Sequence, residues 1–323
     1  MRKSALKPKR IFVSGASGFV GKRLCEIAHE KGYEVIGGSR QKIKGPKYQV
    51  IETGDLSNLA PDFEVQLRGI DVVIHLAARA HTSDSNLDNP LDIYRKINVE
   101  GTLRLARAAA NAGVKRFVYL SSIKAVGEFS SKDPMPIGHE KPTDAYGISK
   151  IEAERQLQNL AEKSGLEIVI LRPPLVYGPM VKANFLKLIK ITELALPMPF
   201  AGAKTKRSYI YIDNLVELIL LSSHHPKAAG RIYHVSDHPP ISLTELIKKI
   251  ASSLNKKARQ FYIPINILIF LATIFGKKEL TNKLFGSQEI DNSEICRDFN
   301  WSPAFSLEYG IDKTVQWYLS KEH

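Results

Sequence analysis

The sequence contains few residues that would tie it to an oxidising compartment or to a bound metal. Only two cysteines, Cys25 and Cys296, occur in 323 residues. They are too few for a disulfide framework and are not spaced like metal ligands. The nine histidines do not combine with acidic residues in a metal-ligand pattern, so no metal is expected. We expect a reducing compartment, with both thiols buried and unreactive.

Long apolar runs are also missing. The most apolar later segment, 263–275 (IPINILIFLATIF), is well short of the ~20 residues that span a bilayer. This length favours a packed helix over an integral membrane segment, with a membrane-contacting face or a dimer contact as the alternative. The basic N-terminal residues MRKSALKPKR lead into a glycine-rich loop rather than an apolar signal core. The protein is therefore expected in the cytoplasm.

Acidic residues are fewer than basic ones, 33 against 46, which leaves a net charge of +13. A nucleic acid, an anionic membrane surface or a phosphate-bearing small molecule would suit this charge, and solubility alone would explain it. The lysines and arginines are spread along the whole chain, without a dense basic run with interleaved aromatic residues. Nucleic acid is therefore not expected as a partner.

Short apolar runs alternate with amphipathic stretches through the first half of the chain. The runs are RIFVS, EVIGG, YQVIETGD, DVVIHLAA, RFVYLSS and EIVILRPP. Near-continuous apolar strands separated by helices are typical of an α/β fold with a doubly wound parallel sheet, the Rossmann fold. We predict this domain over residues 1–180 and a smaller C-terminal substrate lobe over 181–323, and we allow for strands and helices of the second lobe that return to the first.

A glycine-rich loop, Gly15-Ala-Ser-Gly18-Phe-Val-Gly21, follows the first strand and opens the first helix. Gly15 permits the tight turn, Gly18 lets the backbone approach phosphates, and Gly21 lets the helix pack close to the sheet. In this strand–turn–helix context the loop predicts a dinucleotide whose pyrophosphate lies on the helix N-terminus. A turn that serves packing alone is the alternative.

The residues at the end of the second strand bear on the choice of dinucleotide. An acidic residue there binds the ribose 2′-hydroxyl of NAD, whereas an arginine accommodates the 2′-phosphate of NADP. Here Ser39 is followed by Arg40, so NADP(H) is favoured and NAD(H) is the alternative. Arg40 would otherwise be a solvated loop charge that binds no ligand. Asp55, which ends the third strand, is placed either to accept from an adenine amino group or simply to form a turn.

A candidate catalytic set lies downstream. The four-residue spacing of Tyr146 and Lys150 puts both on one face of a helix whose N-cap is Thr143 or Asp144. An adjacent ammonium is expected to lower the pKa of the tyrosine from about 10, so that it serves as a base. Ser122 closes a strand upstream, where ligands bind in such sheets.

Eight motifs occur in order along nearly the whole chain: GASGFVG at 15–21, GDL at 54–56, HLAA at 75–78, NVEGT at 98–102, SSIK at 121–124, YGISK at 146–150, RPPLVYGP at 172–179 and RSYIYIDN at 207–214. Together they resemble the extended short-chain dehydrogenase/reductases, in the nucleotide-sugar epimerase/dehydratase group. The nearest likeness is the UDP-glucose 4-epimerase-like subgroup, which includes reductases of UDP-4-keto sugars. The resemblance implies a UDP-hexose substrate, N-acetylated in the favoured case, and a homodimer is common in such relatives.

The resemblance implies roles for individual positions. Ser122, Tyr146 and Lys150 would be catalytic, with Asn98 supporting the site through its helix. Substrate would be bound by Ser122, Lys124, Tyr146, Asn184 and Arg207. The positions expected to bind the cofactor are Gly15, Ser17, Gly18, Phe19, Val20, Gly21, Ser39, Arg40, Asp55, Leu56, Leu76, Ala77, Ala78, Asn98, Tyr146, Lys150 and Pro173.

The chain departs from the group at a few positions. Leu175 stands where many relatives have asparagine, and the usual diphosphate-binding arginine of the C-terminal lobe is absent near GSQEID, where Lys283 is a substitute. Ser122-Ile-Lys124 lacks the acidic pair that dehydratases carry, so dehydration is disfavoured.

The reaction itself is left between alternatives. A 4-keto-sugar reductase is favoured by Arg40, because cells keep NADPH as a reductant, and a 4-epimerase with tightly bound NAD is the alternative. A catalytically idle NADP-binding regulatory protein and a small-ketone or flavonoid-type reductase stay open as other classes.

Overall fold

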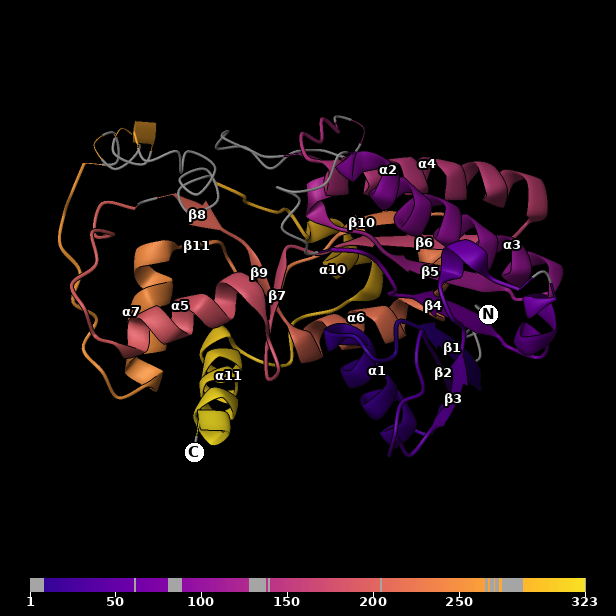
Figure 1. Ribbon diagram of the computed structural model, residues 1–323, viewed down its shortest axis with the longest axis horizontal. Helices are drawn as coiled ribbons and strands as arrows, with labels where there is room; N and C mark the ends of the chain where they lie inside the picture. Colours follow the sequence, from indigo (N-terminus) through magenta and orange to yellow (C-terminus); the bar gives the residue numbers. More distant parts are fainter. Residues whose placement is uncertain are drawn as a thin grey trace.

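The computed structural model describes residues 9–60, 62–80, 89–127, 138, 140–203, 205–264, 267, 270, 273–274 and 287–322. Figure 1 shows a layered part built on one sheet and, beside it, a smaller group of helices and short strands. The sheet has seven parallel strands in the order β10-β6-β5-β4-β1-β2-β3. Their bounds are β1 Arg10–Ser14, β2 Glu34–Ser39, β3 Gln49–Glu52, β4 Val72–His75, β5 Arg116–Leu120, β6 Glu167–Arg172 and β10 Ile232–His234.

Helices cover both faces of this sheet (Figure 1). Side chains along β1 alternate between two apolar cores: Ile11 and Val13 lie in one, and Phe12 lies in the other. The first core includes α1 (Phe19–Glu30), α6 (Ile212–Ser222) and α10 (Ser293–Phe299). The second includes η1 (Leu56–Asn58), η2 (Phe63–Leu67), α3 (Gly101–Asn111) and α4 (Ala145–Ser164). This arrangement confirms the predicted doubly wound parallel sheet.

In its described residues, the smaller lobe contains two short strand pairs and three helices around its own apolar core. Strand β7 (Leu175–Tyr177) pairs in parallel with β9 (Tyr209–Tyr211), and β8 (Lys206–Arg207) pairs antiparallel with β11 (Ile241–Ser242). The helices are α5 (Ala183–Glu193), α7 (Leu243–Ser253) and α11 (Leu307–Glu322). The short helical turns elsewhere are α2 (Pro90–Tyr94), η4 (Arg95–Glu100), η5 (Ile123–Ala125) and η6 (Pro226–Ala228).

The large sheet contains strands from both sides of residue 180 in the sequence. Strand β10 pairs with β6 through Ile232 and Ile170, and helix α6 packs against the first core. The division into lobes at residue 180 therefore stays a prediction, because the chain passes to the smaller lobe and returns to the sheet before it ends.

Two expectations about single segments need correction. Most of 263–275 lies outside the described residues, but Ile267, Phe270 and Ile274 are helical and expose 48%, 64% and 62% of their surface. These three side chains are not packed in a core, since no described part of the chain covers them. Within the part of the chain that the structure describes, no helix is long and apolar enough to cross a membrane.

The two cysteines also differ from each other. Cys25 is buried on α1, and burial raises the pKa of its thiol to about 12. Cys296 is only half-buried, although burial also raises its pKa. Both thiols are therefore held in the protonated, less nucleophilic form, but the expectation that both are buried holds for Cys25 alone.

Candidate active site

The loop between β1 and α1 leaves no room for side chains at its glycines. Gly15 has φ of +74°, and a Cβ there would lie 2.8 Å from the backbone nitrogen of Ala77. A Cβ on Gly21 would lie 2.1 Å from the carbonyl oxygen of Gly15. The helix thus begins directly against the turn, which lets a ligand reach the backbone.

The start of α1 suits an anion. Gly18 is the N-cap and provides no side-chain hydrogen bond, and the first turn, which Phe19 and Val20 open, has no acidic residue. The first N–H groups of a helix lack partners within the helix, and its dipole favours negative charge there. The loop therefore fits the pyrophosphate of a dinucleotide, and the chain's backbone would hold it.

The end of β2 is less decisive about the dinucleotide. Ser39 is buried and its hydroxyl donates to the Ser17 hydroxyl at 3.1 Å, whereas Arg40 is exposed. Asp55 accepts from the Ser57 N–H at 2.9 Å and caps η1. That hydrogen bond lowers the pKa of Asp55, with smaller effects from Lys96 and Arg40. Asp55 has a structural role as a cap, and its role toward adenine stays a prediction.

The other predicted cofactor positions lie around the carboxyl ends of β4 and β6. Leu76 and Ala77 donate their N–H groups to the Ser14 hydroxyl at 3.2 and 3.4 Å. Ala78 is exposed and Leu56 is buried. Pro173 is buried and its carbonyl accepts from Ile123 N–H at 2.9 Å.

The predicted catalytic residues come together at this edge. Asp144 is the N-cap of α4 and accepts from Gly147 N–H at 2.7 Å. Tyr146 and Lys150 follow in its first two turns, and Ser122 is the N-cap of η5. The Ser122 hydroxyl hydrogen-bonds Tyr146. Two hydroxyls from different elements therefore meet where β5 ends.

The electrostatics differ from the sequence expectation. Burial raises the pKa of Tyr146 above its ordinary value, the Ser122 hydrogen bond opposes this rise, and Asp144 adds to it. Burial lowers the pKa of Lys150 to about 7. Lys150 Nζ lies 5.9 Å from the centre of the Tyr146 ring. The predicted lowering of the Tyr146 pKa by this ammonium is outweighed by the burial of the tyrosine, which raises that pKa.

Lys150 instead belongs to a network of buried polar groups that was not predicted from the sequence. Its Nζ donates to the Tyr119 hydroxyl at 3.1 Å and to the Leu120 carbonyl at 2.9 Å, which leaves one N–H for a ligand. Tyr119 hydrogen-bonds Thr102 and stacks on His75, with ring centres 5.7 Å apart. The sequence signal was a histidine inside an otherwise apolar strand.

His75 is held as a neutral ring. Thr102 donates to the Asn98 carbonyl at 2.6 Å, so its oxygen accepts from Nε2 of His75, 2.8 Å away. Nδ1 then accepts from the Ser14 hydroxyl at 2.6 Å. Burial, with a smaller contribution from Lys150, lowers the pKa of His75 to about 3.

Asn98 connects its own helical segment to α4 through hydrogen bonds. It lies in the π-helical stretch η4 and is fully buried. Its Oδ1 accepts from Arg79 N–H at 2.8 Å, and its Nδ2 donates to the Arg79 carbonyl at 3.1 Å and the Ser149 hydroxyl at 3.0 Å. Ser149 lies between Tyr146 and Lys150 in sequence, so Asn98 helps fix the helix that carries both.

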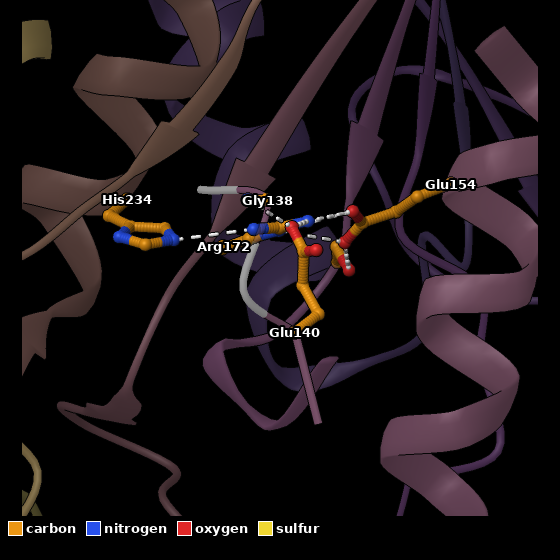
Figure 2. Close-up of polar contacts among 6 residues, drawn as sticks. Gly138, Glu140, Glu154, Arg172 and His234 are labelled. Atoms are coloured by element: carbon orange, nitrogen blue, oxygen red, sulfur yellow. Dashed lines mark hydrogen bonds and ion pairs between the residues drawn. The ribbon is translucent and has the colours of Figure 1, made fainter. Parts of the chain in front are cut away.

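A buried ion cluster fixes α4 to the sheet. Figure 2 shows Arg172, from the end of β6, between His234 and Glu154, with Glu140 beneath it. Arg172 is 0% exposed and donates from Nη2 to Glu154 Oε2 at 2.6 Å and to Glu140 Oε1 at 2.9 Å. The Ser121 hydroxyl also bonds Glu154. Because residues 146, 150 and 154 share one helix face, this cluster sets the rotation of α4.

His234 completes the cluster from β10. Its Nε2 lies 3.4 Å from Nη1 of Arg172. Since a guanidinium only donates, Nε2 accepts and the ring is neutral. Burial, together with the charge of Arg172, lowers the pKa of His234 to about 4.

The predicted substrate residues are spread over both lobes. Lys124 Nζ pairs with Asp144, which links η5 to the start of α4. Asn184 is exposed near the start of α5, and Arg207 is half-buried on β8. Lys283 lies outside the described residues. Among the residues described, no group of histidines, cysteines and acids could hold a metal ion.

Comparison with known proteins shows which family the chain resembles. The model of the NAD dependent epimerase/dehydratase family matches residues 11–236. The UDP-glucose 4-epimerase of Vibrio cholerae is 38% identical over 97% of this chain and 96% of that protein. The N-acetyl-alpha-D-glucosaminyl-diphospho-ditrans,octacis-undecaprenol 4-epimerase of Escherichia coli O157:H7 is 26% identical over 95% and 94%. The structure of UDP-glucose 4-epimerase from Thermotoga maritima with UDP-glucose superposes with a TM-score of 0.77, at 22% identity, over 97% of this chain and all of that one, which shows a shared fold.

The buried cluster predicts a large difference between two glutamates on α4. Glu154→Ala leaves the buried Arg172 with one carboxylate fewer, and we expect the free energy of unfolding to fall by about 3–5 kcal/mol. Glu152→Ala breaks an ion pair with Arg95, whose side chain is 44% exposed, and should cost far less, because water screens that pair. Urea unfolding measures both, and equal losses would contradict the importance of the cluster.

The two neutral histidines predict acid lability. The pKa values of His75 and His234 are lowered to about 3 and about 4, against about 6.5 in an unfolded chain. Between these values the unfolded chain binds more protons than the folded one, so stability falls as the pH drops below about 6.5. Urea midpoints at pH 7, 5.5 and 4.5 test this fall, and His234→Gln should flatten it. An unchanged slope in that variant would be the contrary result.

Proposed function

Because the chain belongs to the NAD-dependent epimerase/dehydratase family, we propose that it is a nucleotide-sugar 4-epimerase that inverts carbon 4 of a UDP-hexose. The observation that carries the proposal is the meeting of Ser122 with Tyr146 and Lys150 at the carboxyl edge of the sheet, next to the glycine loop. The 38% identical relative is named a UDP-glucose 4-epimerase, which supports the same reaction here. Action in the cytoplasm, as the sequence predicts, is part of the proposal.

The relatives favour epimerisation over the reductase reading that Arg40 suggested. The 38% identical and the 26% identical relatives described above are named 4-epimerases, and the family description specifies NAD. Arg40 is an exposed side chain, so a place in solvent accounts for it without a 2′-phosphate. We therefore propose NAD as the cofactor, held through both half-reactions, in place of the NADP preference.

The chain's own residues supply the proton chemistry. NAD, when bound, would supply the acceptor and donor of the carbon 4 hydride. Tyr146 takes the proton from the carbon 4 hydroxyl and later gives it back, and Ser122 hydrogen-bonds the same oxygen. Lys150, tied to Tyr119 and Leu120, keeps one N–H for a ribose hydroxyl. Tyr146 must be ionised to take this proton; burial disfavours that form and the Ser122 hydrogen bond favours it.

Substrate contacts are proposed from both lobes. Arg207 would bind the diphosphate, because a planar guanidinium matches phosphate oxygens, and Asn184 would add a neutral donor at the start of α5. Lys124, next to the catalytic serine, would lie near the sugar. Its ammonium stands where a dehydratase would need an acid, which supports epimerisation over dehydration.

The first experiment measures the reaction itself. Purified protein is incubated with UDP-glucose and with UDP-N-acetylglucosamine, and the sugar products are separated. We expect interconversion with the 4-epimer without added cofactor. Tyr146→Phe should lose at least about a hundredfold in kcat while still holding the cofactor. Tyr94→Phe is the matched control, since its ring lies 6.1 Å from that of Tyr146 and takes no part in proton transfer. Full activity of Tyr146→Phe would exclude the assignment.

The second experiment identifies the cofactor. Acid denaturation of the purified protein should release NAD close to one per chain, because an epimerase does not exchange its cofactor between turnovers. Release of NADP, or an empty protein that prefers NADPH in titrations, would instead support the reductase.

A further inference from the structure

Large apolar side chains are exposed on two segments of the smaller lobe, the loop after α5 and the segment after α7. We call the exposed side chains of Leu194, Leu196, Phe261 and Tyr262 the apolar tip. Their exposed fractions are 63%, 56%, 45% and 68%. Single exposed apolar residues are ordinary on protein surfaces, but a group of large ones marks an interaction site.

Backbone hydrogen bonds hold the two halves of the apolar tip together. Met198 N–H donates to the Arg259 carbonyl at 2.8 Å, and Phe261 N–H donates to the Met198 carbonyl at 3.0 Å. Ala201 N–H adds a bond to the Phe261 carbonyl at 3.2 Å. Met198 itself is buried, so this two-stranded contact is anchored to the lobe and presents its outer side chains on a fixed base.

The apolar surface continues along the chain. Ile267, Phe270 and Ile274 are helical and between 48% and 64% exposed. These three exposed apolar side chains follow the apolar tip in sequence, and both groups lack a covering partner among the described residues.

Positive charge prevails in the chain beside this surface. Residues 246–278 contain seven lysines and arginines and no aspartate or glutamate, and one of the seven, Lys249, pairs with Glu308. Lys256, Lys257 and Arg259, next to the apolar tip, are all exposed. The acidic residue next to Leu194 is Glu193, and its carboxylate accepts from the Tyr318 hydroxyl at 2.5 Å. The surface therefore combines exposed aromatic and aliphatic groups with unbalanced positive charge.

We propose that the apolar tip and the cations beside it dock the protein on the surface of an anionic lipid bilayer. Aliphatic and aromatic side chains enter the boundary between headgroups and acyl chains, while lysines and arginines contact anionic headgroups. Two copies of this chain meeting through the same surface would bring like charges together, which disfavours self-association as the occupant.

This docking rests on residues that the proposed reaction does not use. The apolar tip lies on the loop after α5 and the segment after α7, whereas the catalytic groups lie at the ends of β5 and α4. Failure of the docking proposal therefore does not affect the epimerase proposal, and failure of the epimerase proposal does not affect the docking proposal.

The test is flotation of the full chain with vesicles in a density gradient. We expect co-flotation with vesicles of equal phosphatidylglycerol and phosphatidylcholine, little with phosphatidylcholine alone, and release as the salt concentration rises. The double substitution Leu196→Ser with Tyr262→Ser should weaken binding about tenfold or more, and so should the triple replacement of Lys256, Lys257 and Arg259 by Gln. The matched control is Val65→Ser, which removes a 49% exposed side chain from η2.

Each outcome decides the proposal. Unchanged turnover of UDP-sugar and an unchanged melting temperature show that the variants are folded. Absence of flotation by the wild-type protein, or equal flotation of all variants, overturns the proposal. A wild-type dimer in sedimentation velocity that the double substitution dissociates, without vesicle binding, assigns the surface to a second copy and also overturns it.

Discussion

The pairing of Arg172 with Glu154 is the interaction on which the arrangement of the site depends. A guanidinium with no exposure to water must have both its charge and its N–H groups satisfied by the protein. Arg172 achieves this with Glu154, Glu140 and His234. These partners come from α4, from the segment before it and from β10, so one buried cation holds three separate parts of the chain around the end of β6.

Helix α4 is held from several sides by similar logic. Asp144 caps its first turn, Asn98 bonds Ser149 from the neighbouring helix, and Lys150 is tied to the end of β5 through Tyr119. Every one of these contacts uses a polar group that would be costly to leave unpaired. The outcome is a helix whose position is set by polar contacts along its length, which is what a catalytic tyrosine needs to stay within reach of a reacting oxygen.

The sequence predicted the parts of this design that are local. The glycine loop, the apolar strands and the four-residue spacing of Tyr146 and Lys150 are short-range patterns, and the sheet agrees with them. The ion cluster could not be read in the same way, because Arg172 and His234 are brought together by the pairing of β6 with β10. The prediction that Lys150 lowers the pKa of Tyr146 was wrong, because residue spacing shows which side chains share a helix face but not how deeply they are buried. Ile267, Phe270 and Ile274 show the same limit: an apolar run indicates burial only if something covers it.

The place of β10 in the sheet has a consequence for how the protein is made. Strand β6 ends at residue 172 and β10 begins at residue 232. The edge of β6 that pairs with β10 therefore stays unpaired until about sixty further residues have left the ribosome. Until then the backbone groups of β6 on that side and the charge of Arg172 have only part of their native partners. Such long-range pairing slows folding and leaves an open strand edge as a site for misassembly. The nascent chain should be most dependent on chaperones in that interval of its synthesis.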